Sequence, residues 1–250
     1  MTVKQKIGRM LRRAPFYPHI YFFNHPFKAK EYSELVKGLK FDRQDVILDV
    51  GCGAGLQTLL FGRRALRIVG IDPNPLPVGR AISDHLECVP QIPAEFRVAT
   101  IEEAKFAEGT FSKIFSVCVL EHIPDFMSAL RECYRVLQPG GVLSFSCDSL
   151  ETIDDPDLKD IHAKRFFVRH WFEGKALKQD LESIGFVNVR VYPIYTSDFA
   201  KHLFEKGIRG EFCYRYMKSI WLSWRLYWAD LFSRRSKGIF LIVRANKPAE

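Results

Sequence analysis

The sequence lacks the features that would assign it to several large classes of protein. None of its six cysteines form a C-x-x-C pair, and no set of cysteines and histidines has zinc-finger spacing, so the common structural zinc sites are excluded. Its uncharged stretches are far shorter than the roughly 18 apolar residues of a membrane span, and we expect no span. The N-terminus has no short apolar core followed by a small-residue cleavage site, which argues against a secretory signal. Unpaired cysteines within apolar runs favour a reducing, cytoplasmic location.

Acidic residues are absent from positions 1–30, which hold seven lysines and arginines. A second basic region runs from Lys201 to Lys237, whereas the part from about Asp42 to Asp160 is closer to balanced. The net charge of +8 is therefore carried mainly by the two ends of the chain, as surfaces added to a near-neutral core. Surfaces of this kind suit an anionic partner, either a membrane surface or RNA.

Short apolar runs alternate with helical patterns along most of the 250 residues, a length that allows one well-buried core. Apolar runs of this length, separated by helical patterns, are typical of a parallel sheet that is covered on both faces. Right-handed crossovers between such strands give a doubly wound fold. The sequence therefore predicts an α/β fold whose sheet has seven, mostly parallel strands, at about 46–50, 67–72, 96–99, 111–120, 142–146, 185–194 and 238–246.

The chain divides into a core and two added segments. The core comprises residues 41–194 and 238–250. Residues 1–40 form a basic, aromatic N-terminal segment that we expect to be helical, beginning with a short amphipathic helix in MTVKQKIGRMLRR. Residues 195–237 form a helical insertion before the last strand, and three of the four tryptophans lie in it.

A glycine-rich turn ends the first expected strand, where Asp49 is followed by Gly51, Gly53 and Gly55. Glycines allow a tight turn and let a ligand approach the backbone without meeting a Cβ atom. The helix that follows presents free N–H groups and the positive end of its dipole to that ligand. A dinucleotide-binding turn has the spacing G-x-G-x-x-G, but Leu56 stands in the place of the third glycine, so the spacing points away from NAD.

Four segments, taken in order along the chain, resemble the motifs of one enzyme family. VILDVGCGAG (46–55) resembles the first motif of class I S-adenosylmethionine-dependent methyltransferases, and IVGIDPNP (68–75) resembles their second. FSKIFSVCVLEHIPD (111–125) and YRVLQPGGVLSFS (134–146) resemble the fourth- and fifth-strand segments of the small-molecule, quinone-biosynthesis-like branch, methyltransferase type 11. The resemblance covers the central half of the chain. It implies a Rossmann-like methyltransferase fold with S-adenosylmethionine as the cofactor.

The resemblance gives the glycine-rich turn a role in binding the cofactor. Gly51, Gly53 and Gly55, with Cys52 between them, would surround the methionine end of S-adenosylmethionine. Asp49 would hold the loop or, through water, the ammonium group of the cofactor. The glycine loop is therefore the expected cradle of the cofactor's amino-acid part.

The resemblance also assigns the adenosine end of the cofactor. Asp72 would accept hydrogen bonds from both ribose hydroxyls, and Pro73 would lie against the adenine. Thr100 stands where the family usually has an acidic residue, so its contact with the adenine amino group would be weaker. Ile101 would still supply an apolar wall for the ring.

At the methyl end, the resemblance places Val117 and His122. His122 is the candidate catalytic base, because histidine titrates near neutrality, although a histidine here can also serve only to orient a loop. Glu121 is expected to hold loop backbone. His162 and His170 could face the acceptor or lie on the surface.

The segment after the fourth strand restricts the methyl acceptor. Enzymes that methylate amino groups of DNA or RNA usually carry D/N/S-P-P-Y/F there, but this chain has VLEHIPDF, so nucleic acid is not the expected acceptor. We expect transfer to oxygen of a small-molecule or lipid-linked acceptor. Asp148 could suggest a metal-dependent site, but a lone aspartate after a strand is commoner as a loop residue, so no metal is expected. An RNA methyltransferase and an inactive S-adenosylmethionine-binding scaffold stay open as alternatives.

The insertion 195–237 gives one further indication of the acceptor. An apolar helix packed on the sheet or on a partner subunit would explain it, although no feature specifies an oligomeric state. It could also be a lid over the acceptor that dips into an anionic membrane surface, where tryptophan and cationic side chains are favoured. The apolar residues at helical spacing and the cations among them are Met217, Ile220, Trp221, Trp224, Trp228 and Leu231, with Arg215, Lys218, Arg225, Arg234 and Arg235.

Overall fold

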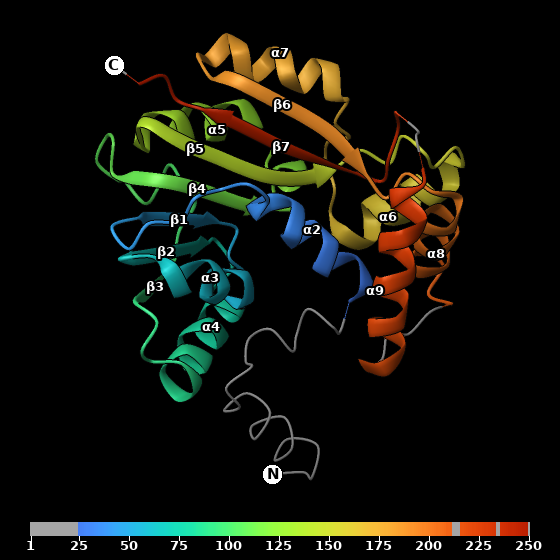
Figure 1. Cartoon of the computed structure of the whole chain (residues 1–250), viewed down its shortest axis with the longest axis horizontal. Helices are drawn as coiled ribbons and strands as arrows, with labels where there is room; N and C mark the ends of the chain where they lie inside the picture. Colours follow the sequence, from blue (N-terminus) through green and yellow to red (C-terminus); the bar gives the residue numbers. More distant parts are fainter. Residues whose placement is uncertain (1–24, 212–215, 234–235, 250) are drawn as a thin grey trace.

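One seven-stranded sheet runs through the protein in the order β3-β2-β1-β4-β5-β7-β6 (Figure 1). The structure, a computed structural model, describes residues 25–211, 216–233 and 236–249. Strand β7 runs antiparallel to its neighbours β5 and β6, and the other pairings are parallel. The expected α/β, mostly parallel sheet is therefore confirmed. Its strands are β1 (Val46–Val50), β2 (Arg67–Asp72), β3 (Ala94–Val98), β4 (Phe111–Val117), β5 (Leu137–Asp148), β6 (Val187–Ile194) and β7 (Phe240–Asn246).

Helices cover both faces of the sheet and gather at the end where the parallel strands finish (Figure 1). None of the described helices is long and apolar enough to cross a membrane. The expected amphipathic helix near the N-terminus lies outside the described residues. The helices are α2 (Pro26–Val36), α3 (Leu56–Phe61), α4 (Pro75–Cys88), α5 (Phe126–Val136), α6 (Pro156–Phe166), α7 (Gly174–Ile184), α8 (Asp198–Ile208) and α9 (Tyr216–Leu231), with short 3-10 helices η2 (Gly62–Arg64) and η3 (Leu120–His122).

Alternate residues of the central strands point to opposite faces of the sheet, as the period of two requires. On one face Leu48 and Ile114 are buried in a cluster that α5 and α7 complete. On the other face Ile47 and Phe115 are buried with Phe61 of α3. Because both faces are covered, the central strands read as continuous apolar runs in the sequence.

Helix α2 lies across the second face of the sheet beside α9 (Figure 1). The hydroxyl of Ser144 on β5 donates to the carbonyl of Leu35 at 2.9 Å. The guanidinium of Arg244 on β7 donates to the carbonyls of Lys37 at 2.6 Å and Glu34 at 3.2 Å. The helix of the 1–40 segment is therefore packed into the sheet and is part of its core.

Two elements differ from the sequence-based expectation. Helix α6 was not expected, although Asp155 caps it by accepting from the N–H groups of Asp157 and Leu158, and Pro156 occupies the first turn. Strand β5 begins at Leu137, earlier than the expected start at about 142, and its pairing with β4 shifts register before Val142, where Gly140 has a positive φ of 74°.

The early start of β5 has a partner in Lys247, directly after the end of β7. The N–H of Gly140 donates to the carbonyl of Lys247, and the N–H of Lys247 donates to the carbonyl of Gly141, both at 3.1 Å. These bonds extend the antiparallel pairing beyond the apolar residues on which the prediction was based.

The insertion 195–237 is built around α8 and α9, and one buried carboxylate ties it to the rest of the fold. Asp230 on α9 accepts from the N–H of Thr196 at 2.7 Å and of Ser197 at 3.1 Å. It also accepts from the ammonium of Lys30 on α2 at 2.5 Å. Asp230 therefore joins α9 to the end of β6 and to α2.

We expect Asp230→Ala to lower the free energy of unfolding by about 3 kcal/mol or more, because it leaves a buried ammonium and buried N–H groups without their acceptor. Urea denaturation measures this change. Asp160→Ala is the matched control, since Asp160 pairs with Lys164 in an exposed salt bridge and should change stability by less than about 1 kcal/mol. Equal midpoints for the two variants would contradict the role assigned to Asp230.

Candidate active site

A cavity of about 430 Å³ opens where β1, β2 and β4 end. The strand order reverses between β1 and β4, and in open α/β sheets ligands bind at such a switch point beyond the carboxyl ends of the strands. Most of the expected site residues that line this cavity come from loops directly after a strand. They are Gly51, Asp72, Pro73, Thr100, Ile101, Val117 and His122.

The glycine loop between β1 and α3 needs glycine for two different reasons. Gly51, Gly53 and Gly55 all have positive φ, between 51° and 76°, a region that other residues occupy at a cost. A Cβ on Gly51 would meet the side chain of Val119 at 2.2 Å, and one on Gly55 would meet the ring of Phe96 at 2.8 Å. A Cβ on Gly53 would meet nothing within 4 Å. Gly51 and Gly55 therefore permit close packing, whereas Gly53 faces open space.

Asp72 at the end of β2 joins the glycine loop to the next loop. Its carboxylate accepts from the N–H of Gly53 at 3.1 Å and from the N–H of Asn74 at 2.9 Å. Asn74 itself caps α4 by accepting from the N–H of Leu76, so Asp72 is not the cap of that helix. A carboxylate offers about four lone pairs, which leaves capacity for hydroxyl donors from the cavity.

Asp49 lies beneath the glycine loop, outside the lining of the cavity. Its carboxylate accepts from the hydroxyl of Thr58 on α3 at 2.5 Å, and its side chain is buried. Burial raises the pKa of Asp49 to about 7, and the nearby charge of Asp72 adds to the shift. The contact with Thr58 supports the expectation that Asp49 holds the loop.

We expect Asp49→Asn to flatten the dependence of stability on pH between about pH 4 and pH 7. The folded-state pKa is raised, so the contribution of Asp49 is fully present below about pH 4 and is lost as pH rises to about 7. Three pKa units correspond to at most about 4 kcal/mol. Urea denaturation at a series of pH values measures it. Parallel curves for the wild type and the variant would contradict a raised pKa at Asp49.

Three further expected residues also lie off the cavity lining. Cys52 is 2 % exposed and packs against the α3–α4 cluster. Gly53 and Gly55 shape the loop without lining the cavity, the first through its N–H bond to Asp72. The structure therefore brings the residues of the loop together, but places only Gly51 against the cavity.

The loop after β3 contributes a carboxylate that the sequence analysis missed. Thr100 and Glu103 exchange two hydrogen bonds, one from each N–H to the other side chain, at 3.0 and 3.2 Å. This turn presents Thr100, Ile101 and Glu102 to the cavity. The family resemblance implies an acidic residue at the position of Thr100. Glu102, which lies two residues later, supplies a carboxylate instead. Two consecutive acids in the loop that follows an expected strand, Glu102 and Glu103, were the signal that could have found it.

The other end of the cavity is formed by the loop after β4. Val117, Cys118 and His122 line it, and Cys118 has a positive φ of 52°. The Nδ1 of His122 lies 3.4 Å from the carbonyl oxygen of Phe167. A bond from Nδ1–H to that carbonyl leaves the lone pair on Nε2, the tautomer that can accept a proton.

Behind this end, α2 places a buried ion pair against the ends of β4 and β5. The Glu31 carboxylate lies 2.7 Å from the ammonium of Lys28 and accepts from the Cys118 thiol at 2.8 Å and the Ser146 hydroxyl at 2.5 Å. Burial alone would raise the pKa of Glu31, but Lys28 and these donors hold it below its usual value. Glu31 is therefore a buried, compensated negative charge.

Next to this ion pair lie Glu121, Asp148 and His162. Glu121 is 1 % exposed, and neither of its carboxyl oxygens has a donor among the described residues. Its backbone carbonyl accepts from the N–H groups of Arg169 at 2.8 Å and His170 at 3.2 Å. The loop is thus held by the backbone carbonyl of Glu121.

His162 is buried, which contradicts the alternative that it lies on the surface. Its Nε2 lies 3.7 Å from Asp148, and its ring is enclosed by Phe166, Trp171 and Phe204. Burial lowers the pKa of His162 to about 4, with a smaller contribution from the neighbouring His122. His162 is therefore neutral at physiological pH. The other uncertain histidine, His170, has Nε2 3.1 Å from the carbonyl of Pro124.

One group of described residues has the donor set of a metal site: ligand atoms of Cys118, Glu121 and Asp148 all lie within 4.8 Å of one another. The ammonium of Lys28 lies 3.5 Å from the Cys118 sulfur and already supplies a positive charge to this group. The expectation that no metal is needed stays a prediction.

Comparison with known families agrees with the geometry of the site. A family model described as a methyltransferase domain matches residues 48–145. A ubiquinone biosynthesis O-methyltransferase from Hahella chejuensis is 39% identical over 101 residues, 40% of this chain and 42% of that protein. The protein of that name from Alkalilimnicola ehrlichii is 34% identical over 123 residues, 49% of this chain and 48% of that protein. The chain thus spans less than half the length of these curated relatives.

Solved structures share the fold at low sequence identity. A phosphoethanolamine N-methyltransferase 2 from Haemonchus contortus, solved with S-adenosylmethionine, superposes with a TM-score of 0.67 at 19% identity, covering 96% of this chain and 60% of that one. An S-adenosylmethionine-dependent methyltransferase from Thermotoga maritima gives 0.61 at 17% identity, covering 91% and 93%. At these identities the likeness establishes the fold.

Proposed function

We propose that this chain, a member of the class I S-adenosylmethionine-dependent methyltransferases, transfers a methyl group to an oxygen atom of a small-molecule or lipid-linked acceptor. The observation that carries the proposal is the cavity at the switch point, with the glycine loop and Asp72 on one side and His122 on the other. When bound, S-adenosylmethionine supplies an activated methyl group. Curated relatives that are named O-methyltransferases support oxygen as the acceptor atom. The cytoplasmic location stays a prediction from the sequence.

The residues around the cavity fit the adenosine end of S-adenosylmethionine. Asp72 keeps free lone pairs for the ribose hydroxyls while its N–H partners fix its orientation. Pro73 and Ile101 offer apolar surface to the adenine, and Glu102 or the hydroxyl of Thr100 is available to its amino group.

The glycine loop fits the amino-acid end of the cofactor. Gly51 lets the backbone lie close against the cavity, and the open space at Gly53 leaves room beside it. Asp49 beneath the loop holds it through Thr58 and, in its ionised form, adds negative charge near the position of the ammonium group. Cys52 and Gly55 support the loop from within the α3–α4 packing.

We expect Asp72→Ala to weaken the binding of S-adenosylhomocysteine at least tenfold, about 1.4 kcal/mol, because it removes the ribose acceptor and an anchor of the glycine loop. Calorimetric titration with S-adenosylmethionine, S-adenosylhomocysteine and NADH measures binding, and we expect the wild type to bind only the first two. Asp160→Ala is the control and should bind as the wild type does. Undiminished affinity in Asp72→Ala would remove Asp72 from the site, and NADH binding alone would contradict the proposed cofactor.

At the methyl end, the chain's contribution is alignment. Holding the acceptor oxygen in line with the methyl group turns an encounter between two molecules into a step within one complex. This alignment removes a large part of the activation barrier. Val117 and Cys118 form the apolar wall there, and we assign His122 as the catalytic residue that contacts the acceptor oxygen. Its Nδ1 faces the Phe167 carbonyl, so Nε2 is the nitrogen that meets the acceptor.

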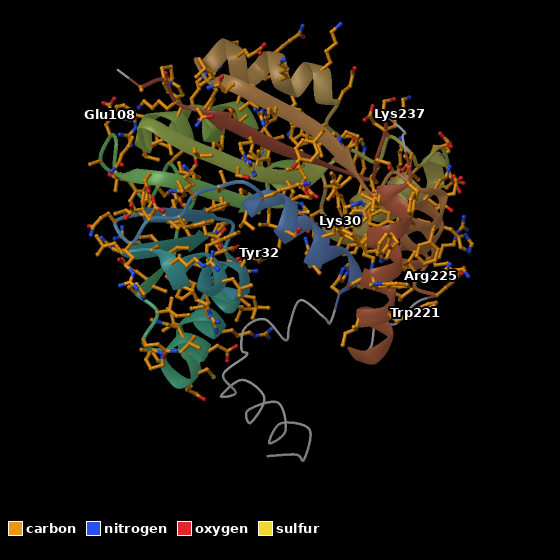
Figure 2. The ribbon with its side chains drawn as sticks, in the orientation of Figure 1. Lys30, Tyr32, Glu108, Trp221, Arg225 and Lys237 are labelled. Carbon is orange, nitrogen blue, oxygen red and sulfur yellow. The ribbon has the colours of Figure 1, made fainter. Side chains whose placement is uncertain are left out.

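The exposed face of α9 supports a lipid-linked acceptor. Leu222 and Leu226 are buried against the rest of the fold, yet the opposite side of the helix also carries large apolar residues. The guanidinium of Arg225 lies 4.9 Å from the ring centre of Trp221, and Figure 2 shows the two side chains together on α9. Tryptophan and cationic side chains on one helix suit the interface of an anionic bilayer. The exposed residues are Ile220, Trp221, Trp224, Tyr227, Trp228 and Leu231.

A second exposed aromatic group lies near the mouth of the cavity. Phe166, Phe167 and Trp171 are exposed by 39–80 %, and the carbonyl of Phe167 is the group that meets His122. Exposed apolar groups of this size mark interaction surfaces. We therefore propose that the protein works at a membrane surface, where a lipid-linked acceptor would be found.

We expect the double variant Trp224→Ala, Trp228→Ala to bind phosphatidylcholine–phosphatidylserine vesicles at least tenfold more weakly than the wild type, because it removes two exposed rings from the interfacial face. Vesicle co-sedimentation measures the partition. The matched control is Leu76→Ala, an exposed apolar residue on α4. Equal binding by both variants would contradict the membrane face. Steeply salt-dependent RNA binding without vesicle binding would instead favour the RNA methyltransferase alternative.

A further inference from the structure

Cys118, at the methyl end of the cavity, has a backbone conformation that a residue with a side chain adopts only at a cost. It is the first residue after β4, and its φ of 52° lies in the left-handed region. A residue other than glycine keeps such a conformation only where its surroundings hold it there, and positions of this kind cluster at ligand sites. Cys118 lines the cavity, so what holds it bears on the site.

The side chain and the N–H of Cys118 are both held, and both contacts lead to one oxygen atom of Glu31 on α2. The Cys118 thiol donates to Oε1 of Glu31 at 2.8 Å. The Cys118 N–H donates to the carbonyl of Ser146 at 3.0 Å and to its hydroxyl at 3.2 Å. That hydroxyl donates to the same Oε1 at 2.5 Å. Because Glu31 and Ser146 are completely buried, solvent does not compete for these contacts.

The second carboxyl oxygen of Glu31 has a separate role. Oε2 lies 2.7 Å from the ammonium of Lys28, one turn earlier on α2. This ion pair offsets the cost of burying the carboxylate. The two roles of Glu31 are thus divided between its oxygens, because Oε2 is neutralised by Lys28 while Oε1 holds Cys118.

The conformation of Cys118 determines where Val119 lies. The side chain of Val119 covers Gly51 of the glycine loop so closely that a Cβ there would lie 2.2 Å from it. The carbonyl of Val119 accepts from the N–H of His122 at 2.9 Å. Val119 also lines the cavity, and it therefore connects Cys118 both to the glycine loop and to His122.

We propose that Glu31 is a positioning residue of the methyltransferase site, which holds Cys118 in its left-handed conformation and so keeps Val119 against Gly51. This inference rests on the proposed function, in which the cavity holds S-adenosylmethionine. Helix α2 precedes the residues 48–145 that match the methyltransferase domain. The N-terminal segment is therefore part of the construction of the site, in addition to being a surface added to the core.

The first test separates the two oxygens of Glu31 by calorimetric titration with S-adenosylhomocysteine. Glu31→Leu removes both oxygens, and we expect it to bind at least about fivefold more weakly than the wild type, because Cys118 is released. Glu31→Gln loses the ion pair with Lys28 but keeps Oε1, and we expect it to bind at least about threefold more tightly than Glu31→Leu. Both variants lose the ion pair, so both should unfold at a lower urea concentration than the wild type.

Glu34→Leu is the matched control, because Glu34 docks the same helix on β6. Its carboxylate accepts from the hydroxyl of Tyr192 at 3.1 Å and pairs with Lys37 at 3.2 Å. Glu34→Leu should unfold at a lower urea concentration, yet bind S-adenosylhomocysteine as the wild type does. An affinity that falls in step with stability across the three variants would mean that α2 acts only through packing, and would overturn the positioning role.

The second test changes Cys118 and leaves Glu31 paired with Lys28. Cys118→Ala removes the thiol donor and keeps the cost of a positive φ, whereas Cys118→Gly adopts this φ freely. We expect Cys118→Gly to bind S-adenosylhomocysteine more tightly than Cys118→Ala, although it lacks one more carbon atom. In the Cys118→Gly background, Glu31→Leu should weaken binding by less than about twofold. Binding by Cys118→Ala at least as tight as by Cys118→Gly, or an undiminished effect of Glu31→Leu in that background, would overturn the proposal.

A third measurement needs no cofactor and separates this inference from the proposed function. The NMR chemical shifts of isotopically labelled cysteine report the backbone conformation of Cys118, whose signal is identified by its loss in Cys118→Ala. We expect left-handed shifts in the wild type and in Glu31→Gln, and a change of these shifts in Glu31→Leu. Unchanged Cys118 shifts in Glu31→Leu would overturn the inference. Failure of the wild type to bind S-adenosylhomocysteine would instead contradict the proposed function, and the NMR comparison would still decide whether Glu31 holds Cys118.

Discussion

The buried edge of the sheet must accommodate four carboxyl groups away from water, and much of the surrounding structure follows from that constraint. Glu31 is compensated by Lys28 and by hydroxyl and thiol donors. Asp49 receives the Thr58 hydroxyl as its donor among the described residues, and burial raises its pKa. Glu121 and Asp148 lie close together, and burial raises the pKa of both carboxyl groups. The buried carboxyl groups are thus stabilised in different ways. Their contacts attach α2 and α3 to the ends of the strands.

The same constraint explains why the site is assembled from distant parts of the chain. Parallel strands bring their carboxyl ends to one edge, so β1, β2 and β4 supply the cavity. Helix α2 reaches this edge from the N-terminal part, and α6 reaches it after β5, carrying His162 to Asp148. Asp230 then ties α9 to α2 through Lys30, and Figure 2 shows Lys30 on α2 where it approaches α9. Helices α2 and α9 are therefore linked by an ion pair as well as by apolar packing.

The sequence predicted the parts of the site that depend on local spacing. Asp72 and Gly51 follow apolar strands directly, and the order of strand ends in a doubly wound sheet brings them to one edge. The contact between Glu121 and Asp148 could not be predicted from the sequence, because it depends on how the ends of β4 and β5 and the η3 loop pack in three dimensions. The burial of His162 could not be predicted for a related reason: helix α6, which buries it, was not expected. Asp155 and Pro156 at the start of that helix form a capping pattern that predicts a helix from the sequence.

The fate of a radiolabelled methyl group shows directly whether the cavity supports methyl transfer to an oxygen atom. The purified protein is incubated with methyl-labelled S-adenosylmethionine and a lipid extract, and the product is treated with acid and alkali. The account predicts label in an extractable compound as an ether that survives both treatments. Binding of S-adenosylhomocysteine without transfer of label to the extract or to small phenols would contradict the account and favour a cofactor-binding scaffold.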